Sequence, residues 1–284
     1  MSKPILEIDG LTKSFGSVQA LRGATFHVNE GEVVALLGDN GAGKSTLIKA
    51  VSGVYPADGG TIRLNGRQVT VRKPRDAMEL GIETIHQDSS LAPHLSIARN
   101  LFLGREPVRQ SWLGLFAPID MKSINGQATE LLRRVGITKK LSADAPVSYL
   151  SGGERQSISI SRAMQFFAKI IILDEPTNNL GVEETHGVLR FIKEVREAGH
   201  SLIYITHNIH HVFEVCDRAV IMRQGEVIAN VRMADSDVLT VEGIITGADL
   251  TKFVKGQTTG GQTTGRQAAG GQATAGQAMG ETNA

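Results

Sequence analysis

The stretch from Gly38 to Thr46, which reads Gly-Asp-Asn-Gly-Ala-Gly-Lys-Ser-Thr, combines residue types that bind phosphate groups. Glycines let the backbone wrap closely around phosphate oxygens, and the free N–H groups at the start of a helix attract negative charge. We expect Lys44 to bridge the outer phosphates of a nucleotide and the Ser45 hydroxyl to bind Mg²⁺. The predicted nucleotide-binding residues of this loop are Gly38, Asp39, Asn40, Gly41, Ala42, Gly43, Lys44, Ser45 and Thr46.

Such a loop must follow a strand and open a helix, and its neighbours in the sequence meet both conditions. Residues 33–37 are a short apolar run, and residues 44–51 have the pattern of a helix. The alternative, a plain glycine-rich turn between a strand and a helix, is disfavoured by the complete motif and by this context. Kinases, GTPases and motor proteins share such a loop, so by itself it predicts only that the chain binds a nucleotide.

A second group of reactive side chains follows the apolar run 170–173, where Asp174 and Glu175 stand side by side before a proline. Chemistry in open α/β sheets takes place at the carboxyl ends of the strands. Asp174 is therefore placed to hold Mg²⁺, directly or through water, and Glu175 to polarise the attacking water as a general base. The alternative is that two acids simply begin a helix, where their charge suits the helix dipole. The phosphate loop earlier in the chain favours the catalytic interpretation.

A third motif, Ser151, Gly152 and Gly153, precedes a helical pattern and lies between the other two motifs. Its bare N–H groups at the start of a helix would attract an anion, although a Ser-Gly-Gly can also be an ordinary N-cap and turn. With this motif in this position, the sequence resembles the ATP-binding cassette (ABC) ATPases, whose signature is a Ser-Gly-Gly that opens a helix. The resemblance covers residues 5 to about 247.

The resemblance implies roles for three further residues. Phe15 matches the aromatic residue that stacks on adenine, although a core phenylalanine is the alternative. Gln87 matches the glutamine that senses Mg²⁺ and the attacking water near the membrane partner, and His207 matches the histidine that contacts the γ-phosphate. The predicted catalytic set is thus Glu175, His207, Gln87 and Lys44, and the predicted Mg²⁺ set is Ser45, Gln87 and Asp174.

Two positions depart from the family pattern. Gly181 replaces the aspartate that ties the two nucleotide sites of a dimer together, so communication between the sites is looser or uses backbone groups. Glu154 replaces the more common glutamine that ends the signature.

Buried strands that alternate with helices predict an α/β fold with a mainly parallel sheet. The resemblance makes this a P-loop NTPase of ABC type, with an antiparallel β subdomain and a helical, signature-bearing subdomain at about residues 88–165. The remaining predicted strands are 5–8, 24–28, 61–64, 202–205, 218–222 and 226–230, and the remaining predicted helices are 123–135 and about 186–198.

The amino-acid composition limits the possible classes of protein and the possible domain organisation. The 30 Lys and Arg against 29 Asp and Glu give a net charge of +1, which argues against nucleic acid as a partner. The chain has no apolar run long enough for a membrane helix, and its single Cys216 cannot form an internal disulfide, so a reducing cytosolic compartment fits best. We expect a nucleotide-binding domain at 1–255 and a disordered Gly/Gln/Thr/Ala-rich tail at 256–284, which is a neutral tether or, alternatively, a partner-binding segment.

Residues around these motifs carry a closer resemblance, and they lie in the stretches 38–49, 85–88, 98–106, 180–182 and 205–211. These stretches resemble bacterial monosaccharide importers of the ribose, xylose and fructose type, nearest to single-cassette fructose-type subunits. This resemblance implies ATP and Mg²⁺ as cofactors, and a homodimer in which each signature completes the partner's ATP site. It also implies membrane-spanning permease subunits, an extracytoplasmic sugar-binding protein and a peripheral location on the cytoplasmic face of the plasma membrane. The alternatives are a soluble ABC ATPase acting on ribosomes or DNA, an accessory cassette without turnover, and an importer of another substrate.

Overall fold

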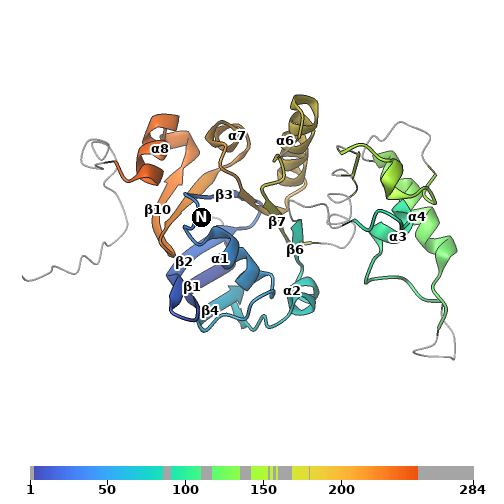
Figure 1. Ribbon diagram of the computed structural model, residues 1–284, viewed down its shortest axis with the longest axis horizontal. Coiled ribbons are helices and arrows are strands. Elements are labelled where there is room, and N and C mark those ends of the chain that lie inside the picture. The colour runs from blue at the N-terminus through green and yellow to red at the C-terminus, as the bar shows by residue number, and fades with distance from the viewer. Residues whose placement is uncertain are drawn as a thin grey trace, which may run out of the picture. The chain divides into compact units, whose positions relative to one another are not determined.

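The computed structural model describes residues 3–85, 91–109, 117–134, 142–152, 154–155, 158, 168–178 and 180–248 (Figure 1). The strands are β1 (Pro4–Phe15), β2 (Val18–Asn29), β3 (Val33–Gly38), β4 (Gly59–Leu64), β5 (Arg67–Val69), β6 (Ile82–Ile85), β7 (Ile170–Asp174), β8 (Ser201–Ile205), β9 (Arg218–Arg223) and β10 (Glu226–Arg232). The helices are α1 (Lys44–Val51), α2 (Pro74–Leu80), α3 (Ile97–Leu101), α4 (Met121–Arg134), α6 (Val182–Glu197), α7 (Ile209–Val215) and α8 (Val238–Thr246).

The chain divides into two units, Met1–Leu250 and Thr251–Ala284. The second unit, and with it the predicted tail, lies outside the described residues, so the boundary predicted near residue 255 stays a prediction. In the described part of the chain, every helix is too short or too polar to cross a membrane.

A six-stranded sheet forms the centre of the first unit, in the order β10-β9-β3-β8-β7-β6. Its neighbours pair in parallel except for β9 and β10, which form a hairpin. The predicted mainly parallel sheet is confirmed. In parallel sheets the carboxyl ends of the strands share one edge, so the loops that follow β3, β7 and β8 lie together.

Both faces of this sheet are covered, which explains why its central strands are apolar throughout. Successive side chains of a strand point to opposite faces, so β3 contributes to two cores. Val34 and Leu36 pack into the cluster that contains β1, β2, β4 and α1. Val33 and Leu37 pack into the cluster that contains α6, α7 and α8. Figure 1 shows these three helices together on one side of the sheet.

The second sheet is antiparallel, in the order β2-β1-β4-β5. The predicted strands 5–8 and 24–28 are too short, because β1 and β2 continue as a ribbon to Phe15 and from Val18. The extension is partly exposed and polar, and its pairing shifts register between Ile8 and Leu11, so an apolar run marks only the buried part. The strand predicted at 61–64 lies within β4, and the turn that follows it places Asn65 at φ 51°.

A buried arginine connects the two sheets. Arg218 of β9 donates to both carboxylate oxygens of Glu32, at 2.7 and 2.9 Å. The same guanidinium donates to the carbonyl of His27 on β2 and to the side chain of Asn230 on β10. Burial alone would raise the pKa of Glu32, but the hydrogen bonds from Arg218 and from the backbone N–H of Asn29 outweigh it and hold the pKa below 4.5.

Replacing Arg218 with methionine is expected to lower the free energy of unfolding by about 3–5 kcal/mol at pH 7, because it leaves the Glu32 carboxylate buried without its partner. Glu32 has a lower pKa in the folded state, so this stabilisation is present above about pH 4.5 and lost as the pH falls through the folded-state pKa. Urea unfolding at several pH values measures the difference, which should shrink below pH 4.5. Adding Glu32→Gln should restore part of the loss; a cost below about 1 kcal/mol at pH 7 would contradict the pairing.

The helices α3 and α4 pack around an apolar cluster of their own, to which α4 contributes Ala128 and Leu132. The helix predicted at 123–135 is thus confirmed as far as Arg134. The buried amide of Asn100 holds the preceding loop by donating to three of its carbonyls and accepting from the N–H of Ala92. The extent of the predicted helical subdomain stays a prediction, since its ends lie outside the described residues.

Candidate nucleotide-binding site

The loop between β3 and α1 has the backbone shape that its glycines predict. Gly41 and Gly43 have φ values of 79° and 102°, in the left-handed region that other residues rarely adopt. Close neighbours add a second requirement, because a Cβ on Gly38 would lie 2.3 Å from the carbonyl oxygen of Met222. At its far end the loop accepts a hydrogen bond at Ala42 from the N–H of Gly225. The β9–β10 turn therefore helps to fix the conformation of the phosphate loop.

Lys44, the first residue of α1, is only 8% exposed. Its ammonium group donates to the carbonyls of Gly38 at 2.6 Å and Asp39 at 3.0 Å. Burial lowers the pKa of Lys44, and the negative charges of Glu175, Asp39 and Asp174 oppose that effect. A cation held by neutral carbonyls next to three carboxylates can transfer its bonds to phosphate oxygens, which are stronger acceptors.

Asp174 ends β7, and Glu175 follows it with a φ of 49°, which is uncommon for a residue with a side chain. The N–H of Glu175 donates to the carbonyl of Ile205 at 2.9 Å, so the acidic turn is fastened to the end of β8. This conformation holds the carboxylate at the carboxyl edge of the sheet, beside the phosphate loop that follows β3.

The Glu175 carboxylate meets two side chains from the neighbouring turns. Asn178 donates its amide N–H to Oε2 of Glu175. Nδ1 of His207, which follows β8, lies 3.5 Å from the same oxygen, and becomes its ion-pair partner when the imidazole is protonated. His207 is 69% exposed at its side chain and Glu175 only 26%, so the histidine faces the open side of the site. The structure thus brings together two residues of the predicted catalytic set, whose catalytic roles stay predictions.

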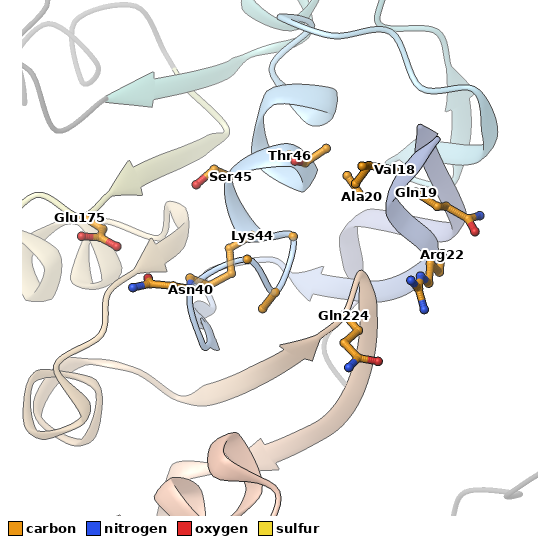
Figure 2. Close-up of a pocket in the computed structure, with 13 residues that line it drawn as sticks. Val18, Gln19, Ala20, Arg22, Asn40, Lys44, Ser45, Thr46, Glu175 and Gln224 are labelled. Carbon is orange, nitrogen blue, oxygen red and sulfur yellow. The ribbon is translucent and has the colours of Figure 1, made fainter. Parts of the chain in front are cut away.

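The phosphate loop and Glu175 border a pocket of about 580 Å³, a volume typical of small-ligand sites (Figure 2). Figure 2 shows that its side chains come from four segments: the start of β2, the loop with α1, the turn after β7, and the β9–β10 turn. The lining residues are Val18, Gln19, Ala20, Arg22, Asn40, Gly41, Ala42, Gly43, Lys44, Ser45, Thr46, Glu175 and Gln224. A second pocket, of about 670 Å³, shares Lys44 and Glu175 with it and extends past His207 to α8.

Residues from β2 and the β9–β10 turn are absent from the sequence-based prediction. Val18, Ala20 and Gln224 line the pocket because segments that are distant in sequence contact each other. One such contact is the hydrogen bond from the N–H of Arg22 to the carbonyl of Gly225. The sequence gives a hint only at Gln224-Gly225, which lie between the predicted strands 218–222 and 226–230. Asn178 carries no local sign that it would bind Glu175.

Other predicted site residues lie apart from this pocket. Phe15 is 43% exposed and packs edge-on against Tyr55, with ring centroids 5.1 Å apart, so its contact with adenine stays a prediction. Ser151 and Gly152 are exposed and line neither pocket. Ser151 caps its helix reciprocally with Glu154, as an N-cap residue does. Gln87 and Gly153 lie outside the described residues.

Comparison with known proteins identifies the family. The model of the ABC transporter family matches residues 21–178. The chain is 42% identical over 247 residues to the fructose import ATP-binding protein FrcA of Rhizobium meliloti, a match that covers 87% of this chain and 95% of that protein. It is 40% identical over 255 residues to the ribose import ATP-binding protein RbsA of Caldanaerobacter subterraneus subsp. tengcongensis. That match covers 90% of this chain but 48% of RbsA, so the chain spans about half of the ribose protein.

Solved structures agree with this assignment. The ADP conformation of MJ1267, an ATP-binding cassette of an ABC transporter, superimposes with a TM-score of 0.72 at 25% identity, over 89% of this chain and 99% of that one. A nucleotide-free ATP-binding cassette from an ABC transporter gives a TM-score of 0.72 at 26% identity, over 84% of this chain and 98% of that one. With the phosphate loop, the acidic strand end and the histidine brought to one edge of the sheet, the chain belongs to the ABC transporter family and is one of its ATP-binding cassettes, an ATP hydrolase.

Proposed function

We propose that this chain is the ATP-hydrolysing subunit of a bacterial monosaccharide importer. The observation that carries the proposal is the meeting of the phosphate loop, Glu175 and His207 around the pocket edge, since these are the groups that ATP hydrolysis requires. The names of the relatives, which are import ATP-binding proteins for fructose and ribose, support sugar uptake as the process that this hydrolysis drives.

In the proposed reaction the loop N–H groups from Gly38 to Thr46 bind the phosphates of ATP, and Lys44 moves its hydrogen bonds from the loop carbonyls to the outer phosphate oxygens. Glu175 takes a proton from the attacking water as that water approaches the γ-phosphorus, and the bond to the leaving ADP oxygen breaks. His207, next to Glu175, contacts the γ-phosphate and helps to hold the water in line.

Mg²⁺ is proposed as the metal, held by Ser45 at the start of α1 and Asp174 at the end of β7. One hydroxyl and one carboxylate oxygen suit this ion, which prefers oxygen ligands and keeps several waters. When bound, the ion neutralises charge that develops on the phosphate oxygens. Gln87 is proposed as a further ligand or sensor of this ion, on the basis of its match to the family glutamine.

A homodimer is proposed as the working form. Ser151 and Gly152 present an exposed helix start that lines neither pocket of its own chain, which supports a role in the site of a second copy. ATP would then favour the closed pair and hydrolysis the open one, a coupling by differential binding to two states. Gly181, which directly precedes α6, has no side chain to tie the two sites together, so we propose that communication between them is looser or uses backbone groups.

The proposed partners are membrane-spanning permease subunits, with an extracytoplasmic sugar-binding protein as an indirect partner. This arrangement would hold the chain peripherally at the cytoplasmic face of the plasma membrane.

The test is affinity purification of the tagged full chain from its native membranes in mild detergent, with mass spectrometry of the proteins that co-purify. A multispanning permease, together with a sugar-binding protein, is the expected result, and an untagged strain is the control. Ribosomal or DNA-repair proteins without a permease would overturn the transport role and leave the ATPase assignment in place.

A further inference from the structure

Tyr204 is a buried polar residue at the point where two loops of the site leave the sheet. It lies on β8 opposite Leu173 of β7, one residue before the pair formed by Asp174 and Ile205. Its side chain is fully buried in the core that faces α6 and α7. Thr206, two residues further along, points to the same face of the sheet and is also buried.

The hydroxyl of Tyr204 makes no hydrogen bond of normal geometry to the described residues. It nevertheless interacts with the hydroxyls of Thr177, in the turn after Glu175, and of Thr206, which precedes His207. Burial raises the pKa of Tyr204, so the group keeps its proton at neutral pH and remains a donor.

A buried donor without an acceptor is costly, and such groups are uncommon in folded proteins. The Thr206 hydroxyl has capacity left for this proton. Thr206 Oγ1 accepts one hydrogen bond, at 3.1 Å from the N–H of Asn208, and a hydroxyl oxygen can accept two. A small shift of either loop would therefore complete a bond to Tyr204, and each of these loops carries one residue of the proposed catalytic pair.

We propose that Tyr204 is a positioning residue for ATP hydrolysis, whose hydroxyl bonds to Thr177 or Thr206 when the two loops adopt their working arrangement and so sets Glu175 relative to His207. A backbone bond from Glu175 to Ile205 already joins the same two segments. Tyr204 would add a side-chain hydrogen bond between these two segments to that backbone bond. This inference rests on the proposed roles of Glu175 and His207.

The test is Tyr204→Phe in the full chain, which keeps the ring and removes only the hydroxyl. We expect kcat to fall about five-fold, the size of one lost hydrogen bond, with KM for ATP within about two-fold of wild type. The urea midpoint should not fall, because the hydroxyl makes no hydrogen bond of normal geometry to the described residues whose loss would destabilise the fold. Thr61→Val is the matched control and should leave kcat unchanged. It removes a buried hydroxyl on β4 of the other sheet that also lacks a hydrogen bond within the described part of the chain.

A double-mutant cycle identifies the acceptor. If Tyr204 acts through Thr177, the variant Thr177→Val should lower kcat by a similar factor, and adding Tyr204→Phe should change it little further. The same holds for Thr206→Val, so the proposal remains testable if one variant fails to fold. Wild-type kcat in Tyr204→Phe, a loss of kcat matched by a loss of stability, or full additivity with both threonines would each overturn it.

Glu175→Gln in the same assay separates this inference from the site assignment. Loss of turnover in Glu175→Gln with wild-type turnover in Tyr204→Phe defeats only the role of Tyr204. Wild-type turnover in both variants defeats the assignment of Glu175 as well.

Discussion

Replacing Glu175 with glutamine is expected to reduce ATP turnover by about 10²- to 10⁴-fold, the usual contribution of a general base, while ATP binding is preserved. Glutamine has nearly the same shape and still offers an oxygen to the amide of Asn178, but it cannot accept a proton from water. Steady-state hydrolysis measures the first effect, and calorimetric titration with ATP measures the second. Because the variant binds ATP without consuming it, size-exclusion chromatography with ATP should also show a persistent dimer.

Glu183→Gln is the matched control, since this exposed glutamate near the start of α6 is outside the site and should keep full activity. Turnover at the wild-type rate in Glu175→Gln would remove Glu175 as the base. Loss of ATP binding in the same variant would contradict the separation of binding from chemistry.

Replacing Lys44 with alanine is expected to weaken ATP binding by about 10- to 100-fold, the effect of losing hydrogen bonds between a cation and phosphate oxygens. The ammonium is positioned by the start of α1, and burial has already removed part of its hydration, so binding costs it little further desolvation. Titration of the full chain with ATP measures the change. Hydrolysis should fall with it at ATP concentrations below the new dissociation constant.

Lys122→Ala, at an exposed position on α4, removes the same charge elsewhere and should leave the affinity for ATP unchanged. Wild-type affinity in Lys44→Ala would refute the assignment of the loop as the phosphate site. Equal losses in both variants would show that net charge, and not position, governs binding.

Much of the central sheet could be predicted because its signals are local. The helix at 44–51 has the predicted bounds, and the apolar runs at 170–173 and 202–205 are β7 and β8, each longer by one residue. Prediction failed where burial is partial, as in the outer part of β1 and β2, where polar residues and a register shift interrupt the pattern. Short helices such as α3, with five residues, are set by packing and capping, since helices of this length are not stable alone.

The residues of the candidate site likewise differ in whether local sequence signals could predict them. The loop residues and the Asp174-Glu175 pair could be predicted, because each motif includes its own backbone context. The positions of Val18 and Gln224 in the pocket wall could not be predicted, because they arise only when two hairpins that are distant in sequence contact the phosphate loop. The proposed role of the Tyr204 hydroxyl could not be predicted either, because a tyrosine within an apolar strand indicates only a core residue.

The cluster around α3 and α4 shares no member with the two cores of the six-stranded sheet, as far as the described residues go. Because the apolar packing is split between separate clusters, one cooperative unit can unfold locally, and its amides can exchange, while another unit stays folded. Backbone amides of α4 should therefore exchange with deuterium more readily than those of β3 and β8. ATP bound at the proposed site would contact the loop after β3, so it should slow exchange in the sheet far more than in the α3–α4 cluster when the chain is monomeric. A second copy that binds the signature would extend the protection to both.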